Sequence, residues 1–299
     1  MNEKEMKLQS FPDHAPSMLP CGNEWKLVWN DEFDLNHLDT EKWGFRTHFW
    51  GHESPTWIKE EGLSFDGQSH MKMNLVRKGD DFYSTHLQTG SMTFDMPKDT
   101  DGFWPFGKLK KPTFMHRYGY YEVRCKLPKN AGWHAAFWLQ APGIGSHPDN
   151  EQCGVEVDIM ESYRVPHDGM VICGCGYGGY GKDCVFPGHF QFPFRETEDG
   201  WHYYGVKWDK EGFTFYADGE KIGFQGHPDN PTSHVDEFLI LSTECHGYHR
   251  FFGGDAGCIR ARADGNDQAF NGSPTKDLLD AQLPDCFEVD FVRVYDAVE

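Results

Sequence analysis

Hydrophobic and polar residues alternate along this chain in short runs, which is typical of β-strands with one buried face. The clearest run covers residues 287–295 and alternates almost throughout. Two further runs, residues 213–216 and 221–224, flank Asp218-Gly219, a dipeptide that favours a tight hairpin turn. Long amphipathic helices are scarce, and residues 276–283 favour only a short helix. The pattern predicts an all-β domain, either a β-sandwich or a jelly roll.

One strand-like segment carries three acidic residues among apolar ones. Residues 154–162 are Gly-Val-Glu-Val-Asp-Ile-Met-Glu-Ser. The alternating valine and isoleucine residues predict a buried face, with Glu156 and Asp158 on the opposite face. A regular strand would place Glu161 on the buried side, whereas a one-residue β-bulge would return it to the side of Glu156 and Asp158.

Three carboxylates on one face raise one another's pKa, so their grouping indicates a chemical use. Retaining glycoside hydrolysis needs two carboxyl groups about 5–5.5 Å apart. Four regular strand steps span roughly 13 Å, so the strand must curve and both glutamates must lean inward. The alternatives are a solvated acidic strand face and a calcium site. Interleaved apolar residues argue against the first, and a rigid strand argues against the second.

The spacing Glu-x-Asp-x-x-Glu at residues 156–161 resembles the signature of family 16 glycoside hydrolases, in the bulged form of their laminarinase, agarase and carrageenase branches. The resemblance covers about residues 25–296 and implies a jelly roll whose concave sheet forms the substrate cleft. We therefore expect an N-terminal arm at residues 1–24, polar and either laid on the surface or disordered, and a single catalytic domain at residues 25–299. The flanking runs that resemble the family are residues 25–34, 118–128, 132–139, 201–208, 213–219 and 289–295.

The resemblance also implies roles for the three carboxylates. Glu156 would be the nucleophile, and Glu161 the acid and then the base, with its pKa raised by burial and by its charged neighbours. Asp158 would hold Glu156 through a hydrogen bond. The implied activity is retaining, endo-acting cleavage of a β-linked glucan or galactan. A transglycosylase with the same residues and a non-catalytic glycan-binding module on the same fold are the alternatives.

Several residues are candidates for substrate binding. Trp133 occupies a position where laminarinase-like relatives carry a sugar-stacking tryptophan, although a core tryptophan would fit as well. His134 follows it and would bond a sugar hydroxyl or pack. Trp138 is a weaker candidate, expected mainly to pack beneath the sheet. Further candidates are Trp50, Trp57, Trp104, Tyr177, Glu244 and Arg250.

The sugar is left open by the chain's departures from the family. Many relatives carry a histidine shortly after the catalytic strand, whereas residues 173–179 contain none. Trp133 favours a β-1,3-glucan, but Thr243-Glu244 is closer to agarase-like members. The long loops 91–114 and 247–286 are expected to decide the substrate. The second contains Arg250, Arg260 and Arg262, which would bind an acidic glycan or form ordinary salt bridges.

Composition limits the partners. A net charge of −19 disfavours nucleic acid and anionic membrane surfaces, and no apolar run reaches the about 20 residues that span a bilayer. We expect a monomer that needs no cofactor for its chemistry. A structural calcium ion is an additional expectation, because Asp290 matches a position where relatives supply a calcium ligand; a solvated or salt-bridged aspartate is the alternative.

The nine cysteines are odd in number, lack CxxC spacing and are expected to be free buried thiols. The first residues contain no hydrophobic signal segment. The sequence therefore predicts a cytoplasmic enzyme if the chain is complete and a secreted one if it is a trimmed piece.

Overall fold

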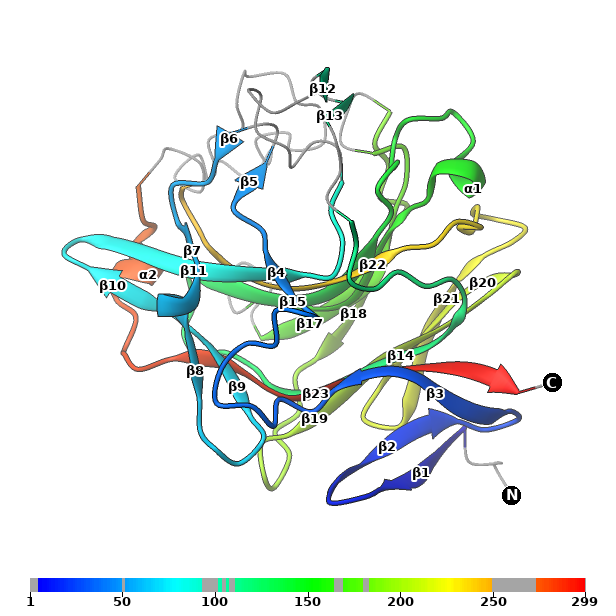
Figure 1. The fold of residues 1–299 in the computed structure, drawn as a ribbon, viewed down its shortest axis with the longest axis horizontal. Helices are drawn as coiled ribbons and strands as arrows, with labels where there is room; N and C mark the ends of the chain where they lie inside the picture. Colours follow the sequence, from blue (N-terminus) through cyan, green and yellow to red (C-terminus); the bar gives the residue numbers. More distant parts are fainter. Residues whose placement is uncertain are drawn as a thin grey trace.

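The computed structural model describes residues 5–49, 52–92, 102–103, 106–107, 111–163, 169–179, 183–248 and 273–298. Two large, mainly antiparallel sheets pack face to face (Figure 1), so the predicted β-sandwich of jelly-roll type is confirmed. Within the described residues, no helix is long and apolar enough to cross a membrane.

The front sheet has nine strands in the order β10-β11-β22-β15-β16-β17-β18, with β4 and β7 paired to β11. It carries the predicted catalytic strand, β16, near its middle. Its strands are β4 (Gly44–Phe45), β7 (Trp57–Ile58), β10 (Val76–Lys78), β11 (Asp81–Gln88), β15 (Trp133–Gln140), β16 (Glu156–Tyr163), β17 (Met170–Gly176), β18 (Phe190–Pro193) and β22 (Phe238–Cys245).

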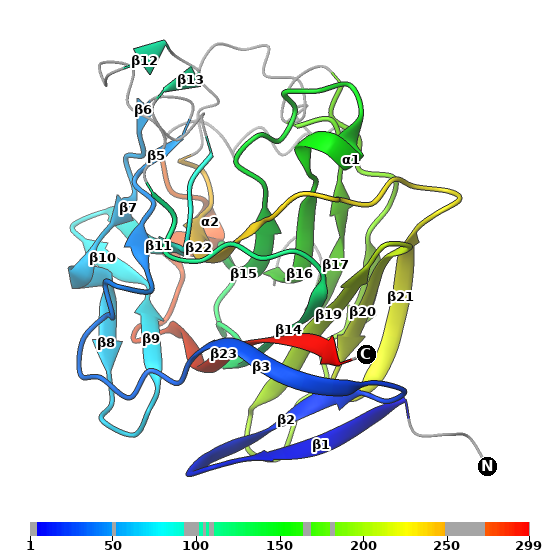
Figure 2. The ribbon, with the colours of Figure 1, turned by 45° about the vertical axis from the view of Figure 1, so that its right-hand side comes forward.

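The back sheet has eight strands in the order β21-β20-β19-β14-β23-β9-β8, with β3 paired to β23. Figure 2 shows this sheet packed against the front one. Its strands are β3 (Glu24–Asp31), β8 (Leu63–Phe65), β9 (Met71–Asn74), β14 (Gly119–Lys126), β19 (His202–Asp209), β20 (Gly212–Ala217), β21 (Glu220–Gly226) and β23 (Cys286–Val298).

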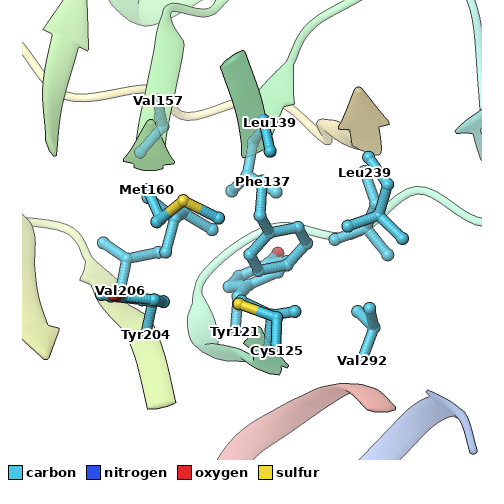
Figure 3. Packing of buried hydrophobic residues seen from close by; sticks show 14 of the residues in the cluster. Tyr121, Cys125, Phe137, Leu139, Val157, Met160, Tyr204, Val206, Leu239 and Val292 are labelled. Atoms are coloured by element: carbon cyan, nitrogen blue, oxygen red, sulfur yellow. The ribbon is translucent and has the colours of Figure 1, made fainter. Parts of the chain in front are cut away.

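The main hydrophobic core fills the space between the two sheets (Figure 3). Phe137 and Val157 of the front sheet meet Tyr121, Val206 and Val292 of the back sheet, and all five are fully buried. Since side chains alternate along a strand, the residues between these core positions face away from the back sheet. We call that side of the front sheet its outer face.

Local predictions from the sequence hold in most places. The Asp218-Gly219 turn joins β20 and β21, and both residues have positive φ angles of 46° and 86°, as a type I′ hairpin requires. The short helix is α2 (Lys276–Leu279), which ends earlier than the predicted segment 276–283. The remaining short elements are β5 (His48–Phe49), β6 (His52–Glu53), β12 (Gly102–Phe103), β13 (Phe106–Gly107), the 3₁₀ turn Glu60–Gly62 and α1 (Asn150–Cys153).

The N-terminal segment forms an antiparallel hairpin, β1 (Met6–Phe11) and β2 (His14–Pro20), where the sequence suggested only a polar arm. Buried Arg293 ties it to the domain by donating to the Ala15 carbonyl at 3.0 Å and to Ser17 Oγ at 2.7 Å. The same guanidinium donates to both carboxylate oxygens of Glu32 at 2.9 and 2.7 Å. The bidentate pair with Glu32 fixes the guanidinium, and its remaining N–H groups then hold the hairpin.

The cysteines are mostly free thiols, as expected. Cys21, Cys125, Cys153, Cys173, Cys175, Cys245 and Cys286 are free. Cys184, however, is disulfide-bonded, so the expectation of free thiols is wrong at that position. Spacing alone could not reveal the bond, because disulfide pairing depends on which loops the fold brings together.

Candidate active site

A β-bulge in β16 places the three predicted catalytic carboxylates on one face. Glu156 lies opposite Gln140 of β15, and Glu161 lies opposite Ala136. Against β17, Asp158 pairs with Gly174 and Glu161 with Ile172, so β16 holds one extra residue between them. This is the predicted bulge, and it is confirmed. All three acids therefore point to the outer face, while neighbouring residues of β16 enter the core.

The carboxylates perturb one another strongly. Burial, followed by the charges of Asp158 and Glu161, raises the pKa of Glu156 well above its ordinary value. The Arg46 guanidinium opposes this rise, and Glu244 adds to it. Since the charges of Asp158 and Glu161 disfavour a charged Glu156, we expect the three carboxyl groups to keep one shared proton near neutral pH.

His189 completes the cluster and was missed by the sequence analysis. Its Nε2 lies 3.3 Å from Asp158 Oδ2, and one ligand atom from each of Asp158, Glu161 and His189 lies within 4.8 Å of the others. Burial lowers the pKa of His189, but its hydrogen bond to Asp158 and the charges of both acids outweigh that and raise it. The raised pKa of His189 favours a protonated imidazole beside Asp158 and Glu161.

Two glycines in β17 make room for the segment that contains His189. A Cβ atom on Gly174 would stand 2.7 Å from His189 Cδ2, and one on Gly176 would stand 2.5 Å from Phe186 Cε1. Gln225 fixes the preceding backbone, since its Nε2 donates to the Gly188 carbonyl at 2.7 Å. Glycine inside a strand indicates that another segment approaches closely, so the two glycines were the sequence feature that could have pointed to the His189 segment. Residues 173–179 contain no histidine, and His189 reaches the acids from further along the chain.

Aromatic rings and one arginine flank the carboxylates on the outer face. The Arg46 guanidinium lies over the rings of Trp57 and Trp138, at 5.5 and 5.4 Å from their centroids. Trp138 donates its indole N–H to Ser242 Oγ at 3.0 Å and sits opposite Asp158 across the β15–β16 pair. Trp138 packs, as expected, but in a buried cluster with Ala136 and Ile240 on the outer face and not in the core beneath the sheet; its place among the substrate-binding candidates remains a prediction.

Glu244 and His134 also lie on the outer face, paired across β22 and β15. Glu244 Oε1 is 3.4 Å from Nε2 of buried His86, whose ring stacks on Trp57 at 3.9 Å between centroids. His134 Nδ1 lies 3.1 Å from His246 Nε2. The structure thus brings both candidates to the side that carries the acids.

Two other substrate-binding candidates are buried away from the outer face. Trp133 is 1% exposed and donates its indole N–H to Asp285 Oδ2 at 3.2 Å, inside a small core cluster with Phe82 and Tyr248. Tyr177 belongs to the core between the sheets. Burial of both side chains argues against a sugar contact by either residue: Trp133 points inward from β15, and Tyr177 lies just past the end of β17. Trp50, Trp104 and Arg250 lie outside the described residues, as do Arg260 and Arg262.

The residues around Asp290 do not fit a calcium ion. Asp290 Oδ2 accepts a hydrogen bond from Arg124 at 2.6 Å, and its Oδ1 lies 3.9 Å from His70 Nε2. A guanidinium in contact with the carboxylate already neutralises it, and its positive charge would repel a divalent cation. The described contacts favour the salt-bridged alternative.

A two-sheet sandwich with clustered carboxylates beside tryptophan rings on one outer face is the arrangement of a jelly-roll glycoside hydrolase. A family model supports this: glycosyl hydrolases family 16 matches residues 68–232, and the chain belongs to that family.

Known proteins agree with the family. The glucan endo-1,3-beta-glucosidase A1 of Niallia circulans is 26% identical over 281 residues, which cover 90% of this chain and 37% of that protein. The kappa-carrageenase of Pseudoalteromonas carrageenovora is 25% identical over 256 residues, covering 79% of this chain and 61% of that protein. This chain therefore spans less than two thirds of the length of either relative.

A solved structure shows the same fold. The catalytic domain of an endo-1,3-beta-glucanase (laminarinase) from Thermotoga petrophila RKU-1 superposes with a TM-score of 0.62 and 21% identity, covering 93% of this chain and 100% of that one.

Proposed function

We propose that this protein is a retaining, endo-acting hydrolase of a β-linked glucan or galactan. The observation that carries the proposal is the bulge in β16, which groups Glu156, Asp158 and Glu161 on the outer face. Retaining hydrolysis needs a nucleophile and an acid/base within about 5–5.5 Å of each other, and a bulged strand brings two glutamates of one strand together.

In the first step, the Glu161 carboxyl donates its proton to the glycosidic oxygen while Glu156 attacks the anomeric carbon. The bond to the leaving sugar breaks and a glycosyl ester forms on Glu156. In the second step, the Glu161 carboxylate takes a proton from water, which attacks the anomeric carbon and releases Glu156. The step needs a charged Glu156, which the nearby positive charge of Arg46 favours.

Asp158 and His189 position this pair. His189, whose raised pKa favours the protonated imidazole, orients Asp158 through the 3.3 Å contact. Grouping the carboxyl groups favours one shared proton in the cluster; in the reactive state that proton is on Glu161 and Glu156 is charged.

The outer face supports a sugar-binding role. Trp138 and Trp57 offer rings near the acids, although each is less than a tenth exposed in this structure, and Glu244 offers a hydrogen-bond acceptor. Relatives named for glucan and for carrageenan both match this chain, so the class of β-linked backbone is decided by experiment.

Product analysis on a panel of glycans tests the proposal. Wild type is incubated with laminarin, mixed-linkage β-glucan, agarose, porphyran, κ-carrageenan and mucin-type glycans, beside Glu156→Ala, Glu161→Ala and the exposed control Glu198→Gln. We expect oligosaccharides of mixed length from one substrate with wild type and control only. Glycan binding without products, unchanged in Glu156→Ala, would replace the hydrolase by a binding module.

Azide rescue then separates the two roles. Azide can enter from the face that the missing nucleophile leaves open, so Glu156→Ala should form a glycosyl azide of inverted configuration. In Glu161→Ala the covalent intermediate still forms with an activated leaving group, so the azide product should keep its configuration. The opposite pattern would exchange the roles of the two residues. Longer products in the presence of added oligosaccharide would identify a transglycosylase.

A further inference from the structure

Away from the outer-face acids, one carboxylate and two imidazoles converge at the loops of the sandwich. Glu151 belongs to α1, in the connection between β15 and β16, whereas His227 and His234 belong to the connection between β21 and β22 (Figure 1). Glu151 Oε1 lies 2.8 Å from His227 Nε2, and Glu151 Oε2 lies 3.5 Å from His234 Nε2. One ligand atom from each residue lies within 4.8 Å of the other two.

Backbone contacts hold these residues in place. The Glu151 N–H donates to Asp149 Oδ1 at 3.1 Å, and its carbonyl accepts from the His234 N–H at 3.0 Å. The His227 N–H donates to the Glu211 carbonyl at 2.8 Å. Since each backbone position is fixed, only side-chain rotation is needed to bring the ligand atoms together.

Tyr118 fixes the ring of His234. Its hydroxyl lies 2.9 Å from His234 Nδ1, and Arg117 donates to the His234 carbonyl at 2.7 Å. A partner on one ring nitrogen sets the tautomer and leaves the other nitrogen free for coordination. An Nδ1–H that donates to the tyrosine oxygen leaves Nε2 unprotonated and directed at Glu151.

We propose that Glu151, His227 and His234 bind a zinc ion, with water as the fourth ligand. Two imidazoles and one carboxylate suit zinc or another late transition metal, whereas calcium and magnesium prefer oxygen ligands alone. Zinc binds such ligands at about 2.0–2.2 Å, so atoms within 4.8 Å of one another need only a modest approach. The side chains are 28%, 40% and 37% exposed, so the ion has an open path from solvent.

The ion would join two connections that are far apart in sequence. The first leads into β16, which carries Glu156, and the second leads into β22, which carries Glu244. A metal that binds only the folded arrangement stabilises it by mass action, so zinc should raise the melting temperature. The proposal assigns zinc no part in the chemistry and does not depend on the proposed function.

Zinc titration of the full chain, freed of any affinity tag, tests the proposal by calorimetry at pH 7.5. Wild type should bind one equivalent, and His227→Ala and His234→Ala should each lose it. The matched control is His147→Ala, which removes an exposed histidine close to α1 but outside the cluster. His189→Ala and His70→Ala should also keep the equivalent, because these histidines belong to two other donor sets, one with Asp158 and Glu161 and one with Asp66 and Glu288.

Tyr118→Phe adds a graded test. It keeps the ring but removes the oxygen beside His234 Nδ1, so zinc affinity should fall about 10- to 100-fold, with the stoichiometry kept. Cobalt in place of zinc should give the visible absorption of a four-coordinate site in wild type and lose it in His234→Ala. Circular dichroism without metal confirms that each variant folds.

Binding that survives in both His227→Ala and His234→Ala would overturn the proposal, as would wild type that binds no zinc. Loss of the equivalent in His189→Ala instead would move the site to the outer face. Zinc affinity of wild type should fall as the pH is lowered, because protons compete with the metal for its ligands.

Discussion

Removing His189 tests the part of the site that the sequence did not reveal. His189→Ala deletes the 3.3 Å contact with Asp158 Oδ2 and the positive charge that faces Asp158 and Glu161. Asp158 is 4% exposed, so little water can replace the lost donor. Asp158 should then lose its orienting partner, and the acids should lose the positive charge that faces them.

The expected loss follows from the kind of bond removed. A hydrogen bond to a charged group contributes about 1.5–3 kcal/mol, and about 1.4 kcal/mol corresponds to a tenfold change in rate. We therefore expect kcat/KM to fall about 10- to 100-fold, mainly in kcat, because His189 acts through Asp158. His189→Gln keeps an N–H donor and should recover part of the loss. Gly174→Ala should act in the same direction, because its Cβ would stand 2.7 Å from His189 Cδ2.

The pH dependence of stability tests the raised pKa of His189 independently of kinetics. The folded-state pKa of His189 is raised, so its contribution to stability is fully present below the unfolded pKa of about 6.5 and is lost as pH rises through the folded pKa. The difference in unfolding free energy between wild type and His189→Ala should thus be largest at pH 5.5 and shrink towards pH 9.

Steady-state kinetics on the substrate found in the panel, with urea unfolding at both pH values, checks these expectations. His37→Ala is the control, because His37 is exposed. The reasoning is refuted if His189→Ala keeps kcat/KM within about twofold of wild type. A rise in KM with unchanged kcat would also refute it, because that pattern indicates a direct sugar contact.

Other substitutions separate packing from function. Trp133→Phe should lower the free energy of unfolding by about 1–3 kcal/mol in urea and leave KM unchanged, whereas Trp138→Ala should lower kcat/KM at least about tenfold. Equal losses of kcat/KM in both variants would contradict the placement of the two rings on opposite faces of β15. Arg293→Met should lower the free energy of unfolding by about 3–5 kcal/mol, and adding Glu32→Leu should restore much of that loss. No recovery in the double variant would contradict the role of the ion pair. Burial raises the pKa of Glu237 to about 8, so its contribution to stability is full below about pH 4.5 and falls towards pH 8. Glu237→Gln should flatten this fall. A difference in unfolding free energy between variant and wild type that does not change with pH would disprove the raised pKa.

Much of the fold was predictable because strand periodicity and turn chemistry are local. The run at 287–295 lies within β23, and Asp218-Gly219 adopts the positive φ angles that its residue types favour. The bulge was predictable too, because only an extra residue between Asp158 and Glu161 explains three acids on one face. The N-terminal hairpin was not, since its anchor is Arg293, far along the chain.

The tryptophans of β15 show the limit of local reasoning. Trp133 and Trp138 are an odd number of positions apart, so a regular strand must place them on opposite faces. The sequence cannot say which face is buried, because that depends on the back sheet that covers it. The structure buries Trp133 beside Asp285 and turns Trp138 towards the acids.

The amino-acid sequence by itself determined the strand-rich fold, the bulged acidic strand and the family to which they belong, because these features are written in neighbouring residues. Only the tertiary structure decided that His189 reaches Asp158 and that His227 and His234 meet Glu151. These contacts join separate connections of the sandwich. Their formation depends on the packing of whole strands, which no local spacing encodes.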